Sequence, residues 1–143
     1  MGTSYTRKFS KMFYLDANFF VFALFDNTKK GENARILQKG IIEGKHSAAT
    51  SVLTIDELMW VIVKLQRKNI LRQVVEDIYA MPNLEVRGVP SLTPVSALDF
   101  MEKYNLKPRD AFHTAIMKQF QLTDIVSDDA DFDRVKGIKR IKL

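Results

Sequence analysis

Carboxylates recur along this sequence at the ends of apolar runs and at the starts of helical stretches. Such oxygen ligands suit a hard divalent cation such as Mg²⁺ or Mn²⁺, which commonly binds one or two carboxylates together with waters and a substrate phosphate. Three or four carboxylates close together would raise one another's pKa values unless a cation were present. Spacing alone does not show that these acids meet in space. The acids are Asp16, Glu57, Asp110, Asp128, Asp129 and Asp131.

Each acid also has a purely structural explanation. Asp16 is suited to cap the N-terminus of a helix, and Glu57 completes a Thr-x-x-Glu capping pattern with Thr54. Asp110 lies in the first turn of a predicted helix, where a negative charge complements the positive end of the helix dipole. The stretch 127–133, SDDADFD, has the composition of a turn, because Asp and Ser readily bond their own backbone. No single position decides between capping and chemistry.

The helical stretch 105–120, NLKPRDAFHTAIMKQF, combines helical apolar spacing with an acid and a histidine in its first turns. Asp110 and His113 lie three residues apart and therefore share one face of the helix. An imidazole one turn from a metal-binding carboxylate can hydrogen-bond to it. A buried histidine with a purely structural role is the alternative.

Short apolar runs alternate with helical stretches along the chain. Strands are predicted at MFYL, HSAA, LEVRGV, DIVS and KRIKL, with helices between them. This alternation predicts one α/β domain with a central, mostly parallel sheet and helices on both faces. Ligands of such sheets bind outside the carboxyl ends of the strands. Asp16 follows the first of these strands, and the acids within 128–131 follow the fourth.

The composition narrows the class of protein. The 143 residues, 46% of them hydrophobic, fit one domain with a single core. The absence of cysteine excludes disulfides and thiolate metal sites. Lys and Arg number 22 against 17 Asp and Glu, and this excess favours contact with a polyanion. We expect a flexible basic N-terminal extension at 1–11, a folded domain at 12–143, no membrane segment and a cytoplasmic location.

Four sequence blocks, taken in order, resemble one family. The blocks are FYLDANFFVFAL, SVLTIDEL, LKPRDAFHTAIM and IVSDDADFDRVKGIKRI. They resemble the PIN domain, the metal-dependent ribonuclease fold of VapC-type toxins in bacterial and archaeal toxin–antitoxin pairs. The resemblance runs from about Met12 to the C-terminus. Its most specific part is an Asp-Ala-x-His helix start followed by Ser/Thr-x-Asp-x-Asp-Phe.

The resemblance implies a Mg²⁺- or Mn²⁺-dependent endoribonuclease that hydrolyses RNA phosphodiester bonds. The ion would be held chiefly by Asp16, Asp110 and Asp129, would polarise the scissile phosphate and would lower the pKa of a bound water. Glu57 would orient or deprotonate that water. Asp131 is an alternative ligand, and Asp128 is a weaker one. The four acids that match the family are Asp16, Glu57, Asp110 and Asp129.

Further residues match the surroundings of such a site. Asn18 matches the family's Asp-x-Asn, Ser127 keeps the hydroxyl of its Ser/Thr-x-Asp motif, and His113 stands behind the ligands. Arg109 is a candidate contact to phosphate. A second basic set would line the RNA path, with a solvated helix face as the alternative; it comprises Lys64, Arg67 and Lys68.

The family also implies partners. These are a small antitoxin protein and a second copy of the chain, with the apolar segment 59–63, MWVIV, as a candidate dimer surface or a part of the core. A catalytically silent PIN-like module that binds RNA or protein, and a housekeeping RNA-processing nuclease without an antitoxin, are the alternative functions. A response-regulator receiver domain is disfavoured, because its acids are distributed differently.

Overall fold

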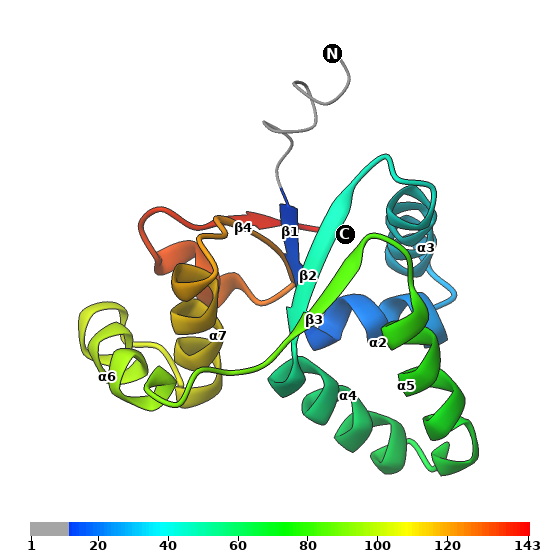
Figure 1. Cartoon of the computed structure of the whole chain (residues 1–143), viewed down its shortest axis with the longest axis horizontal. Coiled ribbons are helices and arrows are strands. Elements are labelled where there is room, and N and C mark those ends of the chain that lie inside the picture. Colours follow the sequence, from blue (N-terminus) through cyan, green and yellow to red (C-terminus); the bar gives the residue numbers. More distant parts are fainter. Residues whose placement is uncertain (1–11) are drawn as a thin grey trace.

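The computed structural model describes residues 12–143, which contain one five-stranded sheet (Figure 1). The strands lie in the order β3-β2-β1-β4-β5, and every neighbouring pair is parallel. The predicted α/β domain with a mostly parallel sheet is therefore confirmed. The expected basic extension, 1–11, lies outside the described residues. The strands are β1 (Met12–Leu15), β2 (Ser47–Ser51), β3 (Leu84–Arg87), β4 (Asp124–Val126) and β5 (Lys139–Ile141).

Helices cover both faces of the sheet, as predicted (Figure 1). One face carries α2 (Ala17–Phe25), α3 (Lys29–Ile42), α4 (Val52–Lys64) and α5 (Leu71–Ala80). The other face carries α6 (Thr93–Tyr104) and α7 (Pro108–Gln119). Two short 3-10 helices complete the described elements, η1 (Lys68–Ile70) and η2 (Ala130–Arg134). None of the helices in this part of the chain is long and apolar enough to cross a membrane.

Successive strand residues point to opposite faces and so supply two separate cores. In β1, Leu15 packs into the core under α2 to α5, whereas Tyr14 packs into the core under α6 and α7. Ala48 and Ala49 of β2 divide in the same way. A parallel sheet covered on both sides requires small or apolar residues on both faces of its central strands. Tyr14 is therefore a polar group placed inside an apolar layer, next to α7.

The helices after β1 and before β4 begin where the sequence predicts. Asp16 is the N-cap of α2 and accepts a hydrogen bond from the backbone N–H of Phe19. Pro108 occupies the start of α7, where its missing N–H leaves no internal hydrogen bond unmade. Asp110 consequently stands in the first turn of α7, close to the positive end of that helix.

The start of α4 differs from the expected one. The helix begins at Val52, directly after Ser51 at the N-cap position. Thr54 therefore lies inside the first turn, and Glu57 lies one turn further along the helix. The interpretation of Thr54 and Glu57 as a capping pair is wrong, because a capping residue must precede the helix. The contacts of Glu57 are instead made with residues of α7.

Candidate metal and catalytic site

The predicted acids gather at the carboxyl edge of the sheet. Asp16 directly follows β1, and Asp129 follows β4, its parallel neighbour. Because parallel strands end at the same edge of a sheet, the acid after β1 and the acids after β4 share one end of the domain. Asp110 and Glu57 reach this edge from the early turns of α7 and α4.

Three of the acids lie close enough to share one cation. Carboxylate oxygens of Asp110, Asp129 and Asp131 all lie within 4.8 Å of one another. The turn after β4 is shaped by its own side chains, since Ser127 Oγ accepts from the Asp129 N–H at 3.0 Å and Asp129 Oδ1 accepts from the Asp131 N–H at 2.9 Å. The structure thus explains the Ser-x-Asp-x-Asp spacing locally, and the turn brings two carboxylates opposite Asp110. We call Asp110, Asp129 and Asp131 the acid trio.

The electrostatics of the trio favour a bound cation. Burial, followed by the neighbouring carboxylates of Asp129 and Asp131, raises the pKa of Asp110 to about 7. Without a cation, Asp110 therefore keeps its proton to a higher pH than a solvent-exposed aspartate does. A divalent cation replaces such a proton and offsets the repulsion between the acids. All the trio's donors are carboxylate oxygens, which is the donor set that Mg²⁺ and Mn²⁺ prefer.

Asp16 is buried beside the acid trio without being one of its members. Its side chain is 6% exposed and accepts hydrogen bonds at 3.4 Å from the Phe19 N–H and from Asn18 Nδ2. Burial raises the pKa of Asp16 to about 6, although the Ser127 hydroxyl and His113 oppose the rise. Asp16 thus caps α2 and is also held next to the turn that carries the trio. The capping explanation and a place at the site are compatible.

The first aspartate after β4 is directed elsewhere. Asp128 forms an ion pair with Lys30 of α3. Asp131, within the trio, also pairs with Arg134 at 2.7 Å. The geometry therefore favours Asp129, with Asp131, over Asp128 as the acids that face Asp110.

Glu57 belongs to a second group, in which an acid faces bases. Its Oε1 hydrogen-bonds to His113 Nε2, and its Oε2 lies 3.7 Å from Arg109 Nε. The Glu57 side chain is 15% exposed, whereas its neighbour Asp56 lies on the exposed face of α4. Of the two adjacent acids, Glu57 is thus the one directed toward α7.

His113 is buried and makes both of its ring contacts away from Asp110. The residue is 2% exposed, and its Nδ1 lies 2.7 Å from the Tyr14 hydroxyl oxygen. The expected hydrogen bond to a site acid is made to Glu57 rather than to Asp110, the acid one turn earlier. His113 nevertheless lies near Asp16 and Asp110, because the charge of its protonated form lowers the pKa of both carboxyls.

The sequence and the fold of this chain match known proteins. A family model described as PIN domain covers residues 13–138. The chain belongs to the PIN domain family. Ribonuclease VapC13 of Mycobacterium tuberculosis is 26% identical over 110 residues, which cover 76% of this chain and 83% of that protein. The resemblance of the four sequence blocks is thereby confirmed.

Solved structures share the PIN fold at low sequence identity. VapC20 of Mycobacterium tuberculosis, a toxin that cleaves the sarcin-ricin loop, matches with a TM-score of 0.70 at 14% identity, over 85% of this chain and 92% of that one. VapBC2 from Rickettsia felis, bound to a promoter DNA fragment, matches with a TM-score of 0.68 at 14% identity, over 92% and 98% of the two chains. These matches establish the architecture that places the acids at one edge of the sheet.

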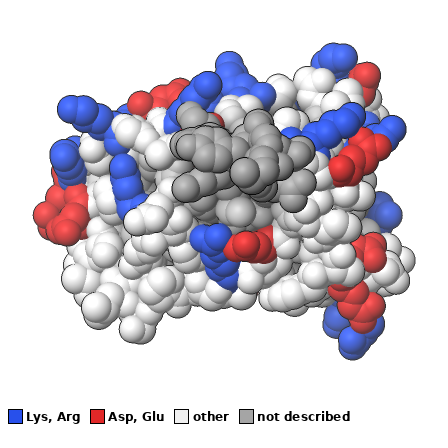
Figure 2. Space-filling view, turned by 45° about the horizontal axis from the view of Figure 1, so that its top comes forward, with Lys and Arg blue, Asp and Glu red and all other residues white. Residues whose placement is uncertain are grey.

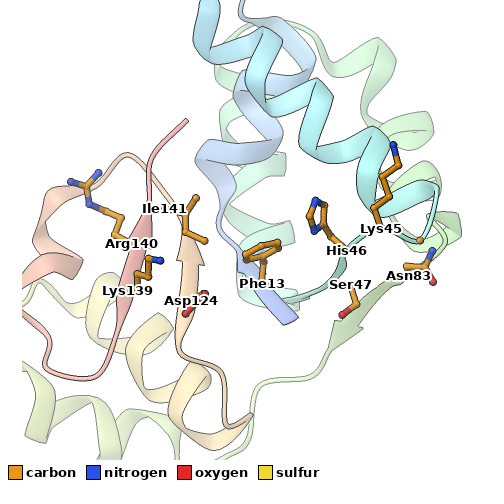
Figure 3. Close-up of a pocket in the computed structure, with 10 residues that line it drawn as sticks. Phe13, Lys45, His46, Ser47, Asn83, Asp124, Lys139, Arg140 and Ile141 are labelled. Carbon is orange, nitrogen blue, oxygen red and sulfur yellow. The ribbon is translucent and has the colours of Figure 1, made fainter. Parts of the chain in front are cut away.

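A hollow at the opposite edge of the PIN sheet has a different character. It has a volume of about 760 Å³, and Figure 3 shows residues from the amino ends of the strands around it, among them Phe13, Ser47, Asp124 and Lys139. Among the described residues that line the hollow, Asp124 is the only acid, and Lys45 and Lys139 are cations. This hollow lacks the clustered carboxylates that a cation site requires, so the carboxyl edge remains the candidate site.

The predicted basic RNA contacts lie at different distances from the acids. Arg109 adjoins the site through Glu57. Lys64 lies about 10 Å along α4 from Glu57 at 1.5 Å per residue, and Arg67 and Lys68 follow that helix. The Arg67 guanidinium lies over the Phe25 ring, 5.5 Å from its centre. On the face shown in Figure 2, basic and acidic residues are interspersed. The RNA path along Lys64, Arg67 and Lys68 stays a prediction.

Sequence reasoning missed Tyr14 and Ser51. The Tyr14 hydroxyl lies 2.8 Å from Ser51 Oγ and 3.5 Å from Thr54 Oγ1, in addition to its contact with His113. Burial raises the pKa of Tyr14 above its usual range, so its hydroxyl keeps its proton. The available signal was a tyrosine two residues before Asp16 in an otherwise apolar strand. Its meaning depends on the residues that face it across the sheet.

Proposed function

We propose that this PIN-domain protein is a metal-dependent endoribonuclease that hydrolyses RNA phosphodiester bonds. The observation that carries the proposal is the acid trio at the carboxyl edge of the sheet, with its oxygens within 4.8 Å of one another. Membership of the PIN family and similarity to VapC ribonucleases support it. A silent binding module would not need to keep three mutually repelling carboxylates half-buried together, because their repulsion opposes folding.

Different residues have different roles in the proposed reaction. Asp110, Asp129 and Asp131, with Asp16 beside them, would hold Mg²⁺ or Mn²⁺. When bound, the ion supplies polarisation of the phosphate and acidification of a coordinated water. Glu57, held by His113 at one oxygen, is placed to orient the attacking water or to accept its proton. Arg109, 59% exposed, is placed to contact a phosphate of the RNA backbone.

The proposed partners are a small antitoxin protein and a second copy of this chain. The antitoxin is proposed from similarity to VapBC2 and to FitAcB from Neisseria gonorrhoeae, whose structure matches with a TM-score of 0.69. The segment MWVIV is divided between core and surface, because Ile62 is fully buried whereas Trp60 is 65% exposed. Co-purification with the product of an adjacent small gene would support the toxin assignment over a housekeeping nuclease.

Cleavage of a mixed RNA panel tests the nuclease proposal. The panel contains single-stranded RNAs and transfer RNAs, each incubated with pure protein in Mg²⁺, Mn²⁺ or EDTA. We expect cleavage that requires the metal and that disappears in Asp110→Asn. Asp99→Asn, the same change at an exposed position of α6, is the matched control and should cleave like the wild type. Cleavage that persists in EDTA or in Asp110→Asn would contradict the proposed site, and a silent wild type would favour the binding module.

A further inference from the structure

Beneath the acids lies a buried chain of hydrogen bonds that joins three of the four segments carrying them. It runs from Ser51 Oγ to the Tyr14 hydroxyl at 2.8 Å, and from that hydroxyl to His113 Nδ1 at 2.7 Å. His113 Nε2 then reaches Glu57 Oε1. Ser51 and Tyr14 are fully buried and His113 is 2% exposed, so protein groups rather than bulk water surround these contacts.

Each member of this chain stands close in sequence to a site acid. Tyr14 precedes Asp16 by two residues on β1, and His113 follows Asp110 by one turn of α7. Ser51 occupies the N-cap position of α4, the helix that carries Glu57. The hydrogen bonds therefore link β1, the start of α4 and α7 at the level just below the acids. Such links restrict how these three elements can move relative to one another.

The chemistry of the groups gives the chain a direction. The ionised carboxylate of Glu57 only accepts hydrogen bonds, so His113 Nε2 must carry a hydrogen. In a neutral imidazole the other nitrogen, Nδ1, is then an acceptor, and the partner available to donate to it is the Tyr14 hydroxyl. The Tyr14 oxygen is left to accept from the Ser51 hydroxyl. Every donor in this order has one acceptor.

We infer that Ser51, Tyr14 and His113 form a positioning relay that fixes the orientation of the His113 ring and thereby holds the Glu57 carboxylate in place. Tyr14 and His113 are positioning residues, because neither is placed to touch the substrate. A buried tyrosine that only filled space would need no hydroxyl, and Phe would fit the apolar layer between the sheet and α7. The hydroxyl is instead used at both ends, by Ser51 and by His113.

The relay predicts a tautomer that NMR can measure on the metal-free full chain. The sequence contains two histidines, His46 and His113, so His46→Asn assigns the ring nitrogen signals. At pH 8.5 we expect His113 to carry hydrogen on Nε2 and not on Nδ1. Tyr14→Phe should leave the hydrogen on Nε2, which Glu57 still accepts, but should move the Nδ1 signal toward that of a nitrogen without a hydrogen-bond donor, and Ser51→Ala should move it less. Tyr104→Phe, the same change on α6 outside the relay, should leave the signals unchanged.

Kinetics test whether the relay positions Glu57 or only stabilises the fold, and this part rests on the proposed nuclease function. Tyr14→Phe should lower kcat about 10–100-fold, as expected for groups that orient reacting side chains, with KM unchanged. Tyr104→Phe should retain the wild-type kcat. Circular dichroism and thermal melting of each variant establish that it is folded.

The two measurements separate failure of the relay from failure of the proposed function. A His113 ring with hydrogen on Nδ1 in the wild type, or a Tyr14→Phe spectrum identical to the wild type, would overturn the relay whether or not the protein cleaves RNA. A shifted Nδ1 signal in Tyr14→Phe with an unchanged kcat would overturn the positioning role. If the wild type cleaves no RNA although its tautomer is the expected one, the nuclease proposal fails, and with it the positioning role, while the hydrogen-bond order stands.

Discussion

The two halves of the candidate site treat their carboxylates in opposite ways. In the acid trio, Asp110 faces two other acids, and its pKa is raised to about 7 by burial and by those neighbours. In the other half, Glu57 faces His113 and Arg109. The first half therefore calls for a cation from outside, whereas the second is neutralised by groups of the chain itself. The proposed function thus places metal binding and water orientation at different parts of one edge.

One substitution in each half of the site would distinguish the roles of the two halves, and we expect the largest effects from these two variants. Asp129→Asn should weaken Mn²⁺ binding and cleavage together, because it removes one of the trio's ligands. Glu57→Gln should lower kcat by about 10²–10⁴-fold, the contribution typical of a general base, while Mn²⁺ still binds. Calorimetric titration with Mn²⁺, measured beside cleavage, checks both. Loss of Mn²⁺ binding in Glu57→Gln would make Glu57 a metal ligand and remove the distinction.

The raised pKa values of the acids predict how pH affects the metal-free protein. Burial raises the pKa of Asp16 to about 6 and that of Asp110 to about 7 in the folded chain, above the usual aspartate value of 3.8. The folded state thus binds these protons more tightly than the unfolded state. The contribution of the two protonated carboxyls to the free energy of unfolding is therefore present in full below about pH 4. It is lost progressively as the pH rises from about 4 to 7.

Asp110→Asn removes this dependence at one of the two acids. In EDTA we expect the variant to melt at a higher temperature than the wild type at pH 8, with a smaller difference at pH 5. Differential scanning fluorimetry at the two pH values measures it. Mg²⁺ should raise the melting temperature of the wild type at pH 8 more than that of the variant, because a ligand that binds only the folded state stabilises it. Equal differences at both pH values would contradict a raised pKa at Asp110.

Arg109→Ala should produce the smallest effect. The Arg109 side chain is 59% exposed, and an exposed ion pair contributes about 0–1 kcal/mol to stability. We expect little change in melting temperature or kcat, a KM for RNA that rises several-fold, and a weaker dependence of binding on salt. The same quantities are measured for Lys64→Ala, a variant farther along α4, and compared with those of Arg109→Ala. A fall in kcat as large as that of Glu57→Gln would instead show that Arg109 helps to hold Glu57.

The sequence predicted much of the fold and the candidate acids for local reasons. Apolar runs marked the strands, and Pro108 marked the start of α7. The motif after β4 contains its own turn, since Ser127 and Asp129 bond the backbone within two residues. The prediction was wrong for the Thr54 and Glu57 capping pair, because Ser51 starts α4 one turn earlier. Capping patterns are short and frequent, so a match to one does not fix where a helix begins.

The amino-acid sequence by itself determined the alternation of strands and helices, the family, and the acids available to bind a cation, because these follow from patterns within a few residues. Only the tertiary structure decided which acids meet. It placed Asp129 and Asp131 against Asp110, directed Asp128 to Lys30, and joined Glu57 through His113 to Tyr14. These partners lie up to 99 positions apart in the chain. Their contacts arise only when parallel strands end at one edge, which no local pattern encodes.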